Sequence, residues 1–200
     1  MRKTRHEDDP RFLINDQHLG PEQLVAMLVK FLENVNVRHL PIGKVHVPPC
    51  SEGDSCAIIV PKAQSREVVA RSLLYYLDLI FIGDFLDRHW HHQRSALHMG
   101  AYVIWVKDDD IGDMSGVTAS NLRGHNIDGL DALEYLMFLA RFKAETGRLP
   151  DNGVWHLCID TIDRQGRSPA YKVDGKKFLV KMIGSDEVSD SDDVVIRTTC

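Results

Sequence analysis

The sequence has few cysteines, no long apolar run and no excess of positive charge. Four irregularly spaced cysteines in 200 residues do not form a disulfide framework. The longest apolar stretch, 73–85, contains two aspartates and is too short to span a membrane. Acidic residues outnumber basic ones by 29 to 24, for a net charge of −5, which argues against a dedicated nucleic-acid binder. The first ten residues carry positive charge but no apolar stretch follows, so they do not resemble a signal peptide. We therefore expect a cytoplasmic globular protein.

Motifs that identify particular chemistries are also missing. The sequence contains no GxxxxGK[ST] phosphate loop, no GxGxxG after a predicted strand and no HExxH zinc motif. A hydrophobic content of 44% and a charged content of 26% are ordinary for a globular chain of this length. We predict a polar N-terminal arm over 1–19 that packs loosely, and a single α+β domain over 20–200.

Three segments have helical periodicity. Gly20 and Pro21 open the first, since proline suits the first helical position. Its apolar stripe consists of Leu24, Leu28, Phe31, Leu32 and Val35. Ser65 is the expected N-cap of the second. We favour a helix that continues through 79–82 to Trp90, kinked at Gly83, although the apolar run 79–82 also suits a strand. The third helix is predicted over 128–146, with Asp128 as its N-cap and Gly147 at its end.

The remaining apolar segments predict strands. They cover 43–47, 56–61, 101–106, 154–162, 170–173, 176–182 and 194–199. Asp174-Gly175 suits a type I′ turn between two of them. The prediction is therefore an α+β fold of three or four helices and a mixed sheet, antiparallel in its C-terminal part.

Ten histidines make this residue over-represented, and they are densest between 84 and 98. On one helix, Asp84, Asp87, His91 and His98 would share the polar side. Carboxylate and imidazole suit zinc, manganese or iron, and an open coordination position would allow hydrolysis. A solvated face with ion pairs to neighbouring arginines is the better explanation, because no specific metal motif is present.

A second set of metal ligands is His46, Cys50, Cys56, His156 and Cys158. Thiolate and imidazole are the ligands of structural zinc, and four of these five would complete a tetrahedron. Their spacing differs from the CxxC pairs of zinc knuckles, so free, partly buried cysteines are the favoured explanation.

Asp108, Asp109, Asp110 and Asp113 follow the strand predicted over 101–106. Oxygen ligands at a strand end are typical of magnesium or calcium sites, but the spacing misses the EF-hand pattern. We favour a charged, solvated loop here.

From residue 101 onward, the layout resembles a family of uncharacterised bacterial proteins of about this length. The residues that carry the resemblance are 101–107, 129–133, 155–158, 168–170, 174–175 and 198–200, roughly half the chain. The Trp-rich end of that family is missing here. The resemblance implies a bacterial-type cytosolic protein and transfers no functional residue.

The leading hypothesis is a non-catalytic binding module. The sequence predicts a complete, well-capped fold, but it contains no specific catalytic motif. Tyr75, Phe81 and Trp90 are the candidates for an exposed patch that meets a protein partner. The alternative is a metal-dependent hydrolase built on the 84–98 cluster, and only this alternative requires a divalent metal. A nucleic-acid-binding role for 88–94 is disfavoured by the net charge.

Overall fold

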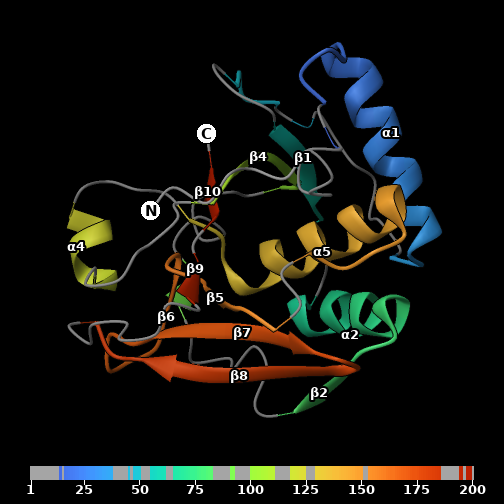
Figure 1. The fold of residues 1–200 in the computed structure, drawn as a ribbon. Coiled ribbons are helices and arrows are strands. Elements are labelled where there is room, and N and C mark those ends of the chain that lie inside the picture. The colour runs from blue at the N-terminus through green and yellow to red at the C-terminus, as the bar shows by residue number, and fades with distance from the viewer. Residues whose placement is uncertain are drawn as a thin grey trace, which may run out of the picture.

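The computed structural model describes residues 14, 16–37, 45, 47–50, 55–61, 65–82, 91–92, 100–110, 118–124, 129–150, 153–185, 194–195 and 197–199. These residues confirm the α+β fold (Figure 1). The helices in this part of the chain are α1 (Pro21–Asn34), α2 (Arg66–Leu77), α4 (Ala119–Gly124) and α5 (Ala132–Thr146).

The strands form three groups. One sheet has the order β1 (Ser55–Val60), β4 (Tyr102–Asp110) and β10 (Arg197–Thr199), with both pairs antiparallel. A larger sheet has the order β2 (Ile80–Ile82), β8 (Lys177–Ile183), β7 (Ser168–Asp174), β5 (Trp155–Leu157) and β9 (Val194–Val195). Its three central strands are antiparallel and its two outer strands pair in parallel, so the predicted antiparallel C-terminal part is confirmed. Finally, β3 (His91–His92) pairs with β6 (Thr161–Ile162).

Helix α5 forms the centre of the core. It is buried on every side from Ala132 to Phe142 and lies between β1 and α1 on one side and α2 and the larger sheet on the other (Figure 1). Its Tyr135 ring stacks on His156 of β5, with the ring centroids 4.5 Å apart. A helix that is buried all round needs neighbours on every side, and the two sheets together with α1 and α2 supply them.

Helix α1 begins at Pro21, as predicted, with Gly20 as its N-cap. The Gln23 side chain accepts a hydrogen bond from the Gly20 backbone N–H. All five members of the predicted stripe, Leu24, Leu28, Phe31, Leu32 and Val35, are buried. Of the strand predicted over 43–47, the described residues Val45 and Val47 are not in a strand.

Part of the segment predicted to pack loosely is buried. Ile14 and Asp16 both belong to the interior. One Asp16 oxygen accepts from the Ala57 backbone N–H at 2.9 Å, and the other accepts from Arg141 at 3.2 Å. The prediction of loose packing is wrong at these two residues because this carboxylate joins β1 to α5.

The predicted continuation of α2 through 79–82 is wrong. Asp78 adopts a left-handed conformation, with φ at +57°, and ends the helix after Leu77. Lys143 of α5 donates hydrogen bonds to the backbone carbonyls of Tyr76 and Leu77. A cation at the helix C-terminus satisfies unpaired carbonyls and interacts well with the helix dipole. Ile80 then pairs with β8, starting β2.

Several other predicted boundaries also need correction. The N-cap of α5 is Asp131 and not Asp128. The strand predicted over 154–162 is two strands, β5 and β6, separated by a turn at Ile159–Asp160. The strand predicted over 194–199 is also two strands, in different sheets. Asp108, Asp109 and Asp110 extend β4 where a loop was predicted, and Asp113 lies outside the described residues.

The predicted hairpin exists, but its turn differs. Asp174 pairs with Lys177, so the two loop residues are Gly175 and Lys176. Only Gly175 has a positive φ, at +59°. A type I′ turn needs a positive φ at both loop residues, whereas glycine first is the type II′ pattern.

We predict that Gly147→Ala lowers the free energy of unfolding by about 1 kcal/mol. Gly147 ends α5 with φ at +70°, and a Cβ there would meet no atom within 4 Å, so the cost is conformational only. Gly124→Ala is the matched control, because that position also has space and lacks a positive φ. Urea unfolding of both variants is the measurement, and equal stabilities would contradict the explanation.

Candidate functional site

The histidine-rich segment does not have the expected geometry at its centre. His91 and His92 belong to strand β3, so the single helix over 84–98 that would align the four predicted ligands does not form at these residues. Asp84, Asp87 and His98 lie outside the described residues. The metal site built on these four side chains remains a prediction.

The zinc ligands proposed from sequence do not assemble among the described residues. Cys56, Cys158 and His156 are buried, Cys50 is half-buried, and His46 lies outside the described part. Among the described residues, one group of three or more possible metal ligands has its ligand atoms within 4.8 Å of one another. It consists of Asp131, Glu134 and Asp160. Burial raises the pKa of the Cys158 thiol well above its ordinary value.

The acidic group at the start of α5 is engaged in holding the helix. Asp131 accepts from the backbone N–H groups of Leu133 and Glu134, at 2.8 and 2.9 Å. Glu134 accepts in return from the Asp131 backbone N–H at 2.7 Å. This reciprocal pattern is a capping box. Both carboxylates are fully buried.

Two further side chains reach this capping box from other elements. Arg66 of α2 donates to Asp131 at 2.6 Å, and Tyr102 of β4 donates to Glu134 at 2.9 Å. Burial raises the pKa of Tyr102, and the nearby Glu134 carboxylate raises it further. Two of the three carboxylates, those of Asp131 and Glu134, therefore have a structural explanation, since they bind a helix end, an arginine and a tyrosine. The Asp-x-x-Glu spacing could have revealed it in the sequence.

A hollow of about 300 Å³ lies beside α1, close to the lower size limit of ligand sites. Leu19, Leu24, Pro48, Cys50 and Trp105 contribute to its walls. No charged side chain lines it among the described residues, and the Gln17 amide is the main polar side-chain group there, so it offers few groups to orient a small ligand.

The strongest candidate is one face of the larger sheet. Successive residues of a strand point to opposite faces, and directly paired residues share a face. Tyr171, Val173 and Phe178 belong to the main core, on the side of α5. We call the opposite side the outer face, and it carries Ile80, Ile82, Trp155, Lys172, Asp174, Lys177, Leu179 and Lys181.

The register places four of these side chains in one row across four strands. Ile82 of β2 pairs with Leu179 of β8, Leu179 pairs with Lys172 of β7, and Lys172 pairs with Trp155 of β5. Three steps between neighbouring strands span about 14 Å. Next to this row, Ile80 pairs with Lys177. Ile80 is 65% exposed and Ile82 46% exposed, which is unusual for isoleucine.

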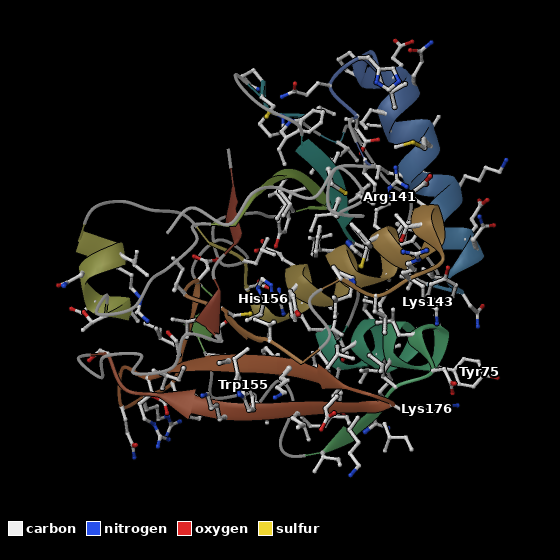
Figure 2. All side chains as sticks on the ribbon, viewed as in Figure 1. Tyr75, Arg141, Lys143, Trp155, His156 and Lys176 are labelled. Atoms are coloured by element: carbon white, nitrogen blue, oxygen red, sulfur yellow. The ribbon has the colours of Figure 1, made fainter. Side chains whose placement is uncertain are left out.

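The ammonium groups of two lysines of this face lie close to the ring of Trp155. The Lys181 Nζ lies 4.5 Å from the ring centroid and the Lys172 Nζ lies 5.8 Å from it. Cation–π contacts of this kind contribute about 0.5–1 kcal/mol at exposed sites. Trp155 and the next residue, His156, lie on opposite sides of β5, with His156 directed towards α5 (Figure 2).

The exposed residues proposed from sequence are only partly those of this face. Tyr75 is 87% exposed, on the outside of α2 (Figure 2). Phe81 packs against the main core, with its ring 6.1 Å from that of Phe178, so its assignment to an exposed patch is wrong. Trp90 lies outside the described residues. The sequence reasoning missed Ile80 and Ile82 because it continued the helix through them.

Comparison with protein-family models, curated proteins and solved structures finds no match for this chain. Among the described residues, no helix combines the length and the apolar character needed to cross a membrane. Functional inference therefore depends on the geometry of the outer face.

We predict that Asp131→Asn lowers the free energy of unfolding by about 2 kcal/mol, because Arg66 loses its buried counter-charge. Glu67→Gln, which breaks the exposed ion pair with Arg71, should cost less than about 0.5 kcal/mol. Denaturant unfolding measures both, and a cost for Asp131→Asn no larger than that of the control would contradict the role of the carboxylate.

Alkaline pH should destabilise the protein through three buried acids. Burial is the first cause of the raised pKa values of Tyr102, Tyr171 and Cys158. The unfolded chain loses these protons near the ordinary values of 9.0 and 10.0, whereas the folded chain keeps them. The stabilisation is complete below pH 9.0 and falls as the pH rises, by about 1.4 kcal/mol per pH unit and group.

Unfolding in guanidinium at a series of pH values tests this expectation. Tyr102→Phe should reduce the slope above pH 10.0 by the contribution of one group. A free energy of unfolding that stays constant up to pH 11, roughly one unit above the ordinary tyrosine pKa, would overturn it.

Proposed function

We propose that this protein is a non-catalytic, cytoplasmic interaction module that binds a protein partner through the outer face. The observation that carries the proposal is the cross-strand row of Ile82, Leu179, Lys172 and Trp155, together with the exposed Ile80 beside it. Tryptophan is enriched in the energetically important centres of protein interfaces, and the exposed aliphatic side chains of the same row add apolar contact area.

The surroundings of this face support the proposal. Helix α4 packs against one end of it, where Ala119 and Leu122 join Leu157, Ala170 and Ile183 in a second apolar cluster. The row from Ile82 to Trp155 lies outside the buried members of that cluster, with Trp155 at its margin. On the opposite, core-facing side of the sheet, the rings of Tyr171 and Phe178 stack with each other and with Tyr135 of α5, which fixes the sheet against the core. A rigid scaffold limits the entropy lost when a partner binds.

A photoreactive benzoylphenylalanine in place of Leu179 tests the proposal in the cells that make this protein. We expect a discrete cross-linked partner, identified by mass spectrometry. The same residue in place of Ala144, exposed on α5, is the control and should give no such product. Adding Ile80→Ser and Ile82→Ser should remove the product at Leu179, because these changes delete apolar contact area and leave the core intact.

Two results would contradict the proposal. One is an equal yield of the same product from the Ala144 position. The other is a product at Leu179 that survives the isoleucine changes in a protein whose circular dichroism and unfolding curve are unaltered.

A further inference from the structure

We propose that the partner of the outer face is an acidic polypeptide segment in which carboxylates accompany apolar side chains. This inference rests on the proposed function and adds the chemistry of the partner. It follows from the distribution of charge on the face and from the position of Trp155.

The outer face is positively charged on a negatively charged protein. Among the described residues, it carries Lys172, Lys177 and Lys181 against a single carboxylate, Asp174, whereas the whole chain has a net charge of −5. None of these lysines forms an ion pair with a carboxylate of the described residues. By contrast, the neighbouring Lys176 in the turn binds Asp78 at 2.5 Å. Unpaired cations grouped on one face attract a partner of the opposite charge.

The apolar side chains favour a polypeptide over a nucleic acid. Ile80, Ile82 and Leu179 are aliphatic, and they complement apolar side chains better than phosphates or sugars. A nucleic-acid sheet surface uses aromatic rings as platforms for bases. Here the ring of Trp155 already has two ammonium groups near it. A stacking base would have to displace them, whereas a carboxylate can bind them where they lie.

The spacing suits an extended segment. Lys177 and Lys181 are four residues apart on β8, and Leu179 lies between them on the same face. Alternate residues of an extended chain are about 7 Å apart. A segment lying along β8 with an acidic, an apolar and an acidic residue on one side would therefore match Lys177, Leu179 and Lys181.

Fluorescence anisotropy with a short labelled peptide that repeats the pattern Glu-Ser-Leu-Ser, so that glutamate and leucine take turns on one side of the extended chain, tests the inference on the full chain. We expect binding to weaken as sodium chloride is raised, since salt screens exposed charges. Lys177→Gln with Lys181→Gln should weaken it by roughly tenfold, because these two lysines are the ones matched to the acidic residues of the segment. The double Lys→Arg variant should keep it, because the charge remains. Lys30→Gln, exposed on α1, is the control and should bind as the unaltered protein does.

A peptide with glutamine in place of glutamate and a labelled oligothymidylate complete the test. Equal binding of the glutamine peptide, or binding unaffected by the Lys→Gln changes, would overturn the inference. Tighter binding of oligothymidylate than of the acidic peptide would also overturn it, in favour of a nucleic-acid partner. If the acidic peptide fails to bind while Leu179 still yields its face-dependent cross-link, the proposed function stands and only the partner chemistry is wrong.

Discussion

The hydrogen bonds of the buried Asp131 carboxylate hold the central helix α5 in place, and the rest of the core packs around that helix. It binds two backbone N–H groups at the start of α5 and the guanidinium of Arg66 on α2. The next backbone N–H, that of Ala132, donates to the Thr161 hydroxyl of β6 at 3.2 Å. Removing a charge from water is costly, and these directed hydrogen bonds offset the cost only in one arrangement. A helix buried on all sides is thus fixed at one end to both α2 and a strand.

The position of α5 decides which side of the larger sheet remains available. Its aromatic residues cover one face through the stack of Tyr135 on His156, and strand alternation sends Trp155 to the other. The same pleat directs Phe81 inwards and Ile80 and Ile82 outwards. The outer face is therefore a direct result of how the core is filled.

The fold class, the stripe of α1 and the buried strand at 102–106 could be predicted, because each depends on local periodicity. The boundaries that failed depend on distant partners. Asp78 ends α2 with Lys143 of α5 beside the last carbonyls, which no local pattern encodes. The outer face was equally hidden, because it brings together Ile82, Trp155 and Leu179 from strands whose order only the folded chain reveals. The capping box of Asp131 and Glu134 is visible in the sequence as an Asp-x-x-Glu pattern, but the prediction placed the N-cap at Asp128, three residues earlier.

The two short strands after residue 193 join sheets that are otherwise separate. Strand β9 completes the larger sheet beside β5, and β10 completes the smaller sheet beside β4. Until residues 194–199 pair, β4 and β5 therefore each have one open hydrogen-bonding edge. Open edges pair readily with other chains. Both sheets are therefore complete only after residues 194–199 have paired, and a chain without this pairing exposes two edges to aggregation.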